Sequence, residues 1–195
     1  MRKGFTLIEL LIVIAIIAIL ALIALPNFLE AQIRAKVSRV KSDLRSLGTG
    51  IEAYLVDYQV IMGSNDVNTI TGLPVDLARE VAYSLLTTPI AYITTAPSDP
   101  FLVTKDTNIR LSLYEFRTCF GFTTGTWANL KLRGFRWAVN SIGPYVVRDT
   151  GDPAMNAVLN ATSPAAQTFV YDPTNGTKSK GFIIRTNKGE YTGSL

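Results

Sequence analysis

The residue with the most unusual setting in this sequence is Glu9, a carboxylate inside an otherwise apolar segment. From Phe5 to Leu25 the chain has 21 residues, and Glu9 is the only charged one. A charge in apolar surroundings is costly unless an opposite charge neutralises it, so Glu9 predicts a partner. Cutting the chain between Gly4 and Phe5 would create a cationic α-amine close to Glu9. In a packed array of such segments, Glu9 of one copy could pair with the Phe5 amine of its neighbour.

The segment that carries Glu9 has the length of a membrane span. A helix of 21 residues is about 30 Å long, which is the thickness of the hydrocarbon core of a bilayer. Three interpretations compete: a cleaved secretory signal, a plain membrane anchor, and an anchor that also packs against other copies. A secretory signal has a shorter apolar core and a small-residue cleavage site, whereas Pro26-Asn27-Phe28 follows here. A plain anchor explains the length but leaves Glu9 without a role.

An apolar stripe continues the helix beyond Pro26. Its residues recur at steps of three and four: Leu29, Ile33, Val37, Val40, Leu44, Leu47, Ile51, Tyr54 and Tyr58. The stripe predicts an amphipathic helix to about Tyr58, with one face covered by a globular domain. Pro26 removes one backbone hydrogen bond and is expected to bend the helix without ending it.

Basic residues lie between the members of this stripe: Arg34, Lys36, Arg39, Lys41 and Arg45. Two interpretations are open, a phosphate-binding face and an ordinary solvated helix face near headgroups or other subunits. Proteins that bind single-stranded nucleic acid usually have aromatic residues between the basic ones, and no aromatic residues accompany these lysines and arginines. We therefore expect a solvated face and no nucleic-acid partner.

The remainder of the chain predicts one short helix. Leu77, Val81 and Leu85 follow a helical period, with Asp76 as the expected N-cap and Pro89 beyond the end.

Strands are expected after this helix. Alternating apolar residues predict one strand from Ile109 to Phe122, with a bulge near Leu113, and a second from Leu130 to Val139, with a bulge at Gly134. The Asn175-Gly176 pair predicts a type I′ turn, with 182–185 as the returning strand. The predicted fold class is therefore α+β: a long N-terminal helix, kinked near Pro26, whose second half packs on a small antiparallel sheet.

Composition excludes several classes of site. The 195 residues carry a net charge of +4, no histidine and one cysteine, Cys119. An internal disulfide, the usual zinc sites and histidine-dependent triads are therefore excluded. Cys119 lies in an apolar run and is expected to be buried. Ser141 lacks a histidine base, no phosphate-cradling loop is present, and we expect no enzyme activity.

The N-terminal motif resembles a known signal. Gly4-Phe5-Thr6-Leu7-Ile8-Glu9 is similar to the class III signal of type IV pilins and type II secretion pseudopilins. In that family a prepilin peptidase cuts after the glycine and N-methylates the new terminal residue, and the glutamate is the assembly residue. The resemblance implies cleavage between Gly4 and Phe5, methylation of Phe5 and assembly through Glu9. Pro26 stands where the family carries a helix-kinking proline.

A second resemblance covers parts of the globular domain. "AYITTAPSDPF" (91–101) and "WAVNSIGPYVVRDTGD" (137–152) are similar to stretches of type II secretion major pseudopilins. In those proteins the loop after Ser-x-Gly binds calcium. Here Tyr145 stands where the family has an acid, and Asp149 and Asp152 remain, with Asp172 as a further acid that could approach. The resemblance implies a weak calcium site at Asp149 and Asp152, and no other cofactor.

These features predict four segments: a leader peptide (1–4), a transmembrane or filament-core helix half (5–25), an amphipathic helix half (26–60) and a globular domain (61–195). The resemblance implies a pilus-like filament subunit, most similar to a type II secretion pseudopilin because no C-terminal disulfide pair is present. A surface type IV pilin for adhesion, motility or DNA uptake is the first alternative. A monomeric membrane-anchored binding module is the second.

The resemblance also implies partners and a location. The expected partners are other copies in a helical homopolymer, prepilin peptidase, an inner-membrane assembly platform, and minor pilins or pseudopilins. Before assembly the chain would cross the inner membrane once, with its N-terminus cytoplasmic and its C-terminal domain periplasmic or extracellular. Counting basic residues does not decide this orientation. Two of them, Arg2 and Lys3, precede the span, whereas four follow it.

Overall fold

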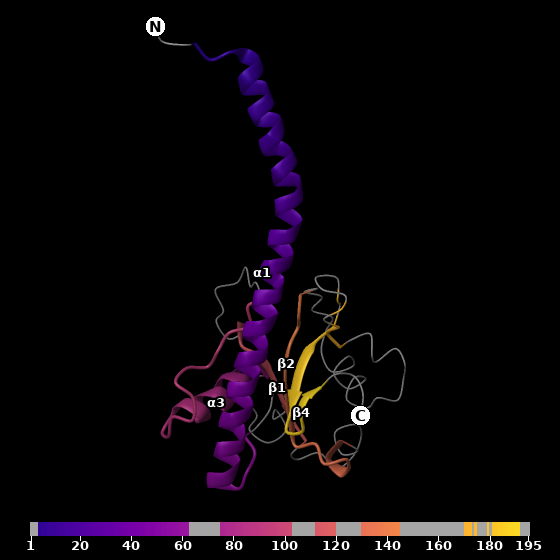
Figure 1. The fold of residues 1–195 in the computed structure, drawn as a ribbon. Helices are drawn as coiled ribbons and strands as arrows, with labels where there is room; N and C mark the ends of the chain where they lie inside the picture. Colours follow the sequence, from indigo (N-terminus) through magenta and orange to yellow (C-terminus); the bar gives the residue numbers. More distant parts are fainter. Residues whose placement is uncertain are drawn as a thin grey trace.

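The computed structural model describes residues 4–62, 75–102, 112–119, 130–144, 170–172, 174, 179 and 181–191. Its elements are helices α1 (Leu7–Tyr58) and α3 (Val75–Thr87) and strands β1 (Glu115–Thr118), β2 (Trp137–Ser141), β3 (Ile183–Thr186) and β4 (Gly189–Tyr191). Figure 1 shows the first half of α1 standing free of the globular domain and the second half lying between α3 and the sheet. The predicted α+β class is confirmed.

Helix α1 is one helix of 52 residues that passes through Pro26 without ending. Figure 1 shows it curved rather than straight. It ends as predicted at Tyr58, where Gln59 takes the left-handed conformation (φ 54°) and its N–H donates to the Leu55 carbonyl at 2.9 Å. The middle of the predicted stripe is buried: Val37, Val40, Leu44, Leu47 and Ile51. Its two ends, Leu29 and Tyr58, are exposed.

The sheet is antiparallel throughout, in the order β1-β2-β3-β4. Successive residues of a strand face opposite sides, and here both sides are covered. Val139 and Ile183 belong to the core shared with α1, whereas Ala138 and Ile184 belong to a second apolar cluster on the other face. Because both faces are covered, every residue of β2 is buried.

The prediction of a strand from Leu130 was wrong, since β2 begins at Trp137 and residues 130–132 are helical. The N–H of Phe135 donates to the Leu130 carbonyl at 3.0 Å, and that of Gly134 to the Lys131 carbonyl at 2.9 Å. These two bonds form a Schellman closure, in which glycine takes the left-handed position; Gly134 has φ 82°. Gly134 is therefore a helix C-cap and not a bulge.

The predicted start of the short helix and the predicted pairing of the last strand also differ from the structure. Helix α3 begins at Val75, so Asp76 lies inside its first turn and is not the N-cap. The predicted strand at 182–185 is largely confirmed as β3, Ile183–Thr186. It does not return antiparallel to residues 170–172, because Phe182 pairs with Val170 in a parallel bridge. Strand β3 instead pairs with β2 and β4. Asn175 and Gly176 themselves lie outside the described residues, as do both ends of the predicted 109–122 strand.

A buried carboxylate, Asp99, joins two loops of the domain. Its Oδ1 accepts the N–H of Phe101 at 2.9 Å, and its Oδ2 accepts the N–H of Ile142 at 3.3 Å. Burial raises the pKa of Asp99, against the opposing effect of hydrogen bonds from the Ser141 side chain and the two backbone groups. The "SDPF" stretch therefore ties the segment before β1 to the end of β2.

Replacing Asp99 with asparagine is expected to destabilise the domain by about 1–3 kcal/mol, because an amide nitrogen cannot accept the second backbone N–H. The raised pKa means that folded Asp99 binds its proton more tightly than unfolded Asp99, so its contribution to stability falls as pH rises through the raised pKa. The asparagine variant loses this component of the pH dependence. Urea unfolding of the full chain in detergent at several pH values measures both effects. An unchanged unfolding free energy would contradict the assignment.

Candidate functional site

Glu9 and Thr6 form a capping box at the start of α1. Thr6 is the N-cap, with extended backbone (φ −83°, ψ 150°), and its Oγ1 accepts the Glu9 N–H at 3.3 Å. The Glu9 carboxylate accepts the Thr6 N–H at 2.8 Å and the Thr6 hydroxyl at 2.7 Å. These bonds satisfy backbone donors that a helix start leaves unpaired. In the single chain, Glu9 is therefore bound by its own helix terminus.

Thr6 was not predicted as a functional residue, although the sequence carried a signal for it. A threonine followed three residues later by glutamate, before an apolar run, is the capping-box pattern. It fixes the first residue of α1 at Leu7, two residues beyond the predicted cleavage point.

The predicted cleavage point, between Gly4 and Phe5, lies in exposed backbone before the helix. A Cβ added at Gly4 would meet no atom within 4 Å, so the fold itself does not require glycine there. The Phe5 side chain is 72% exposed. The geometry leaves the peptide bond accessible and places the amine that cutting would create at the N-terminal end of α1.

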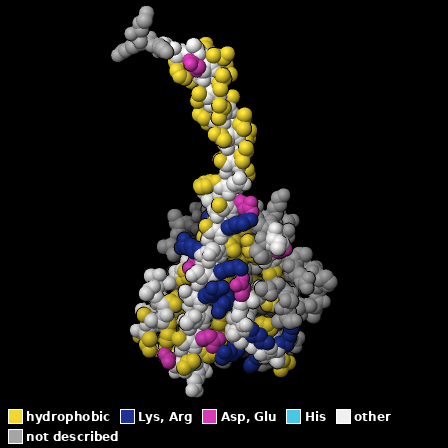
Figure 2. All heavy atoms as spheres, in the orientation of Figure 1, with side chains coloured by type: hydrophobic (Ala, Val, Ile, Leu, Met, Phe, Trp, Pro, Cys, Tyr) yellow, Lys and Arg dark blue, Asp and Glu magenta, His cyan; other side chains and the backbone are white. Residues whose placement is uncertain are grey.

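The first half of α1 has no cover in the single chain. Its most apolar 18-residue window has a mean hydropathy of 3.2, and none of it is buried. Figure 2 shows this half as an almost continuous apolar column, with one acidic side chain near its end. By length and composition the helix is able to cross a membrane. We assign it as an N-terminal membrane anchor.

The second half of α1 is held to the sheet by polar contacts as well as apolar ones. Glu52 accepts from Arg136 Nη2 at 2.9 Å and from Trp137 Nε1 at 2.8 Å. The hydroxyl of Tyr114 donates to Asp43 at 2.9 Å, and burial together with this bond raises the Tyr114 pKa. These contacts attach the globular domain to the same helix that carries the exposed apolar half.

The predicted calcium residues Asp149 and Asp152 lie outside the described residues. Asp172 is described, and its Oδ1 accepts from the backbone and hydroxyl of Thr174, at 2.8 and 2.6 Å. These bonds lower the pKa of Asp172. Within the described ranges, no three residues of metal-binding type gather. The calcium site therefore stays a prediction.

If calcium binds between Asp149 and Asp152, adding it in excess over its dissociation constant is expected to raise the melting temperature. The expected gain is about 2.7 kcal/mol at a hundredfold excess. Thermal melting of the full chain with calcium and with a chelator measures it, and Asp149→Asn should abolish the shift. Identical melting temperatures would remove the site.

The one cysteine is buried, as predicted. Cys119 is 2% exposed and belongs to the second apolar cluster. Burial raises the pKa of its thiol to about 11. The thiol is therefore protonated at neutral pH and inert as a nucleophile.

Comparison with known proteins identifies the N-terminal segment. Residues 1–25 match the prokaryotic N-terminal methylation motif. The chain is 54% identical over 52 residues to the type IV major pilin protein PilA of Myxococcus xanthus, covering 27% of this chain and 24% of that protein. It is 53% identical over 57 residues to the type IV major fimbrial protein FimA of Dichelobacter nodosus, covering 29% and 36%.

A fimbrial protein of Pseudomonas aeruginosa is 44% identical over 63 residues, covering 32% of this chain and 41% of that protein. The chain thus spans between a quarter and two fifths of the length of these relatives. No solved structure gives a significant match.

Proposed function

We propose that this chain, whose N-terminal segment belongs to the type IV pilin family, is a structural subunit of a pilus-like filament. The observation that carries the proposal is the first half of α1, which is wholly exposed in the single chain. Such a surface needs lipid or other apolar helices around it. Membrane insertion covers it before assembly, and the same half of neighbouring copies covers it in the filament.

In this proposal a prepilin peptidase removes residues 1–4 and methylates Phe5. Glu9 then gives up its hydrogen bonds to Thr6 and forms an ion pair with the Phe5 amine of a neighbouring copy. Pairing of these charges sets the register between helices, while apolar burial supplies most of the stabilisation. The orientation follows from the peptidase, since the leader must meet it at the cytoplasmic face. The globular domain then lies on the periplasmic or extracellular side.

Two kinds of filament are open within this function. A type II secretion pseudopilin is supported by the "PSDPF" and "NSIG" stretches at residues 97–101 and 140–143. A surface type IV pilin is supported by the relatives, which are a type IV major pilin, a type IV major fimbrial protein and a fimbrial protein. The relatives' similarity covers stretches shared by both kinds, so we propose the pilin-like filament as the function. An assembly platform and minor subunits of the same kind are the proposed further partners.

Mass spectrometry of the native N-terminus tests the proposal. The expected result is a chain that begins at N-methylated Phe5 and lacks residues 1–4. Gly4→Leu should abolish this processing without lowering the melting temperature, since the Gly4 position contacts nothing. An intact Met1, or a cut beyond the apolar run, would overturn the proposal. The alternative of a monomeric membrane-anchored module predicts that no filaments form, whether or not residues 1–4 have been removed.

A further inference from the structure

Three tyrosines and one aspartate meet at the C-terminal end of α1. The rings of Tyr54 and Tyr58 are stacked, with centroids 4.5 Å apart and an interplanar angle of 26°. Tyr92 meets Tyr54 edge to face at 5.9 Å, and its hydroxyl donates to Oδ2 of Asp57 at 2.5 Å. These four residues form the tyrosine cluster. Figure 1 shows this end of α1 at the opposite end of the molecule from the N-terminus.

The tyrosine cluster carries a negative charge that no described lysine or arginine neutralises. Asp57 is the one charged residue in 53–62, and residues 81–98 contain none. Among the described residues, the contact of Asp57 is Tyr92, which leaves Oδ1 of the carboxylate open. The last turn of α1 has no basic residue, so the negative end of the helix dipole adds to the charge of Asp57. This end of the molecule therefore attracts a cation.

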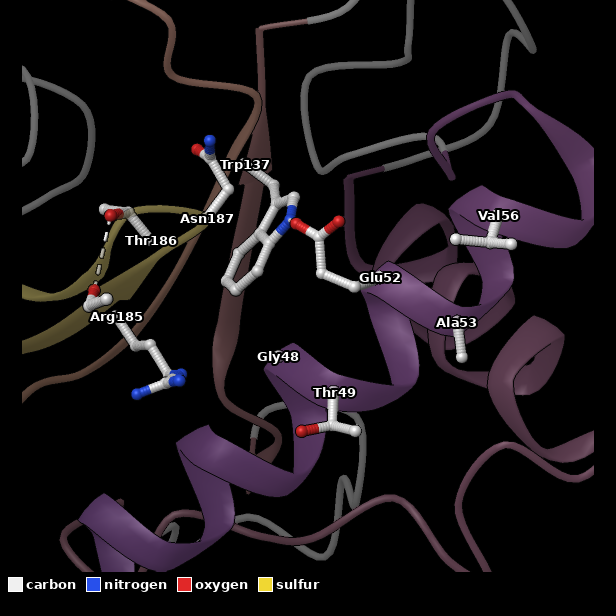
Figure 3. A pocket seen from close by; sticks show the side chains of 10 residues that line it. Gly48, Thr49, Glu52, Ala53, Val56, Trp137, Arg185, Thr186 and Asn187 are labelled. Atoms are coloured by element: carbon white, nitrogen blue, oxygen red, sulfur yellow. Dashed lines mark hydrogen bonds between the residues drawn. The ribbon is translucent and has the colours of Figure 1, made fainter.

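Glu52, the preceding acid on α1, is neutralised by contrast. It accepts from Nη2 of Arg136 at 2.9 Å and from Nε1 of Trp137 at 2.8 Å. Figure 3 shows its carboxylate beside the Trp137 indole, in the pocket lined by α1 and the sheet. Tyr92 gives Asp57 a hydrogen bond but no opposite charge, and this bond is the main cause that raises the pKa of Tyr92 to about 12. Tyr92 is therefore a neutral donor at neutral pH, and the charge of Asp57 remains.

The surroundings of Asp57 favour an organic cation over a metal ion. Calcium takes about six to eight oxygen ligands, whereas the tyrosine cluster offers one carboxylate. Aromatic rings attract cations to their faces, and Tyr58 is 44% exposed although Tyr54 covers one face of its ring. A guanidinium suits both parts of the cluster, because its plane stacks on an aromatic ring and its N–H fork fits a carboxylate.

Apolar residues beside the cluster indicate that this guanidinium belongs to a protein. Val60 and Ile90 are each 50% exposed. Val60 follows Tyr58 by two residues, and Ile90 precedes Tyr92 by two. Exposed apolar residues next to tyrosines are typical of surfaces that bind proteins, and arginine and tyrosine are enriched among the residues that dominate such contacts.

A second copy anchored at the same depth in a membrane does not supply the arginine. Tyr58 lies 33 residues beyond Leu25, which is about 50 Å along a helix. Neighbouring copies in a membrane therefore present the same ends to each other. Residues 53–62 and 81–98 contain no lysine or arginine, so two such ends would repel each other. The arginine must then come from a different protein.

We propose that the tyrosine cluster binds an arginine side chain of a different protein. The guanidinium lies on the exposed face of Tyr58, and its N–H groups donate to Oδ1 of Asp57. Apolar groups next to that arginine contact Val60 and Ile90. All of these residues belong to the single chain, so the inference goes beyond the filament function and does not depend on it.

A peptide titration of the full-length chain in neutral detergent tests this site. The probe is an acetylated, amidated Gly-Arg-Gly peptide, and its control carries citrulline, which keeps the shape of arginine without the charge. The arginine peptide is expected to shift the NMR signals of the Tyr58 and Tyr92 rings until they saturate, and added salt should weaken the binding. The citrulline peptide should give no saturable shift. Equal shifts from the two peptides would overturn the inference.

Substitutions in the cluster separate the charge from the ring. Asp57→Asn keeps an acceptor for Tyr92 but removes the charge, so it is expected to weaken peptide binding about tenfold. Tyr58→Leu removes the ring and should weaken binding about threefold, whereas Tyr58→Phe should stay within about twofold of the wild type. Glu30→Gln, the same loss of charge at an acid elsewhere on α1, is the matched control and should bind like the wild type.

Melting of each variant in detergent checks that its fold is kept. Undiminished binding by Asp57→Asn, or equal binding by Tyr58→Leu and Tyr58→Phe, would contradict the site. Sedimentation tests a second copy as the occupant: Asp57→Asn is expected to form as much filament as the wild type, and a loss of filaments would overturn the assignment to a different protein. Absence of filaments from the wild-type chain would overturn the proposed function alone, because the peptide titration needs no filament.

Discussion

Replacing Glu9 with leucine is expected to abolish filament assembly while leaving cleavage and membrane insertion intact. In the proposed array the substitution leaves the Phe5 amine of each neighbour charged and unpaired in an apolar setting. Removing one partner of a buried pair costs about 3–5 kcal/mol, which corresponds to a loss of roughly a hundredfold or more at each contact. Sedimentation and electron microscopy of filaments, with mass spectrometry of the N-terminus, measure assembly and processing separately.

Glu30→Gln provides the matched control. Glu30 is also an acid on α1 and pairs with Arg34 at 2.6 Å, but the pair is exposed beyond the apolar half. Exposed pairs contribute about 1 kcal/mol or less, so this variant should still assemble. Normal filaments from Glu9→Leu would show that Glu9 has no assembly partner, and the proposed register would be wrong.

The second large effect is expected at Gly181, where three backbone segments meet. A Cβ at Gly181 would overlap the backbone of Val170 and Tyr171. Gly143 has φ 72°, and a Cβ there would overlap the Gly181 carbonyl. Because the obstructing atoms are backbone, neither position can relax by rotating a side chain. The backbone of the Ser141-Ile142-Gly143 stretch thus packs closely against the backbone just before β3, and both contact positions are glycines.

Gly181→Ala is therefore expected to cost about 3 kcal/mol, at the upper end of overpacking effects. In a domain of this size this corresponds to a fall of roughly 6–12 °C in melting temperature. Thermal unfolding in detergent measures it, with Gly4→Ala as a control that should not change the melting temperature. A melting temperature equal to that of the wild type would mean that the 170–171 segment packs differently.

The N-terminal half of the fold was predictable because its signals are local. The stripe from Val37 to Ile51 follows the helical period, and all of its members in that range are buried. Glu9 and Gly4 are identified by their spacing to each other and to the apolar run. Nothing distant in the sequence is needed to interpret either feature.

The sheet was less predictable because its pairings join distant residues. Leu130 and Leu132 are spaced two apart, as in a strand, yet the Schellman closure at Gly134 makes that stretch a helix end. Strand β4 has three residues, too short for a periodic signal. The side chains of Trp137 and Arg185 pack against the α1 backbone at Gly48, where there is no Cβ. This contact depends on strand register, which no local sequence pattern encodes.

The capping box has a consequence for the kinetics of assembly. Thr6 is fixed as the N-cap of α1, so cutting after Gly4 leaves the new Phe5 amine only one residue before the helix cap. Consecutive Cα atoms are about 3.8 Å apart, and the amine can sample only a small volume near its own Glu9. This short connection gives the Phe5 amine a high effective concentration near Glu9 of its own chain. To pair with that amine, Glu9 of a neighbouring copy must displace the Glu9 of the same chain. Filament growth should therefore depend on many contacts between copies forming together.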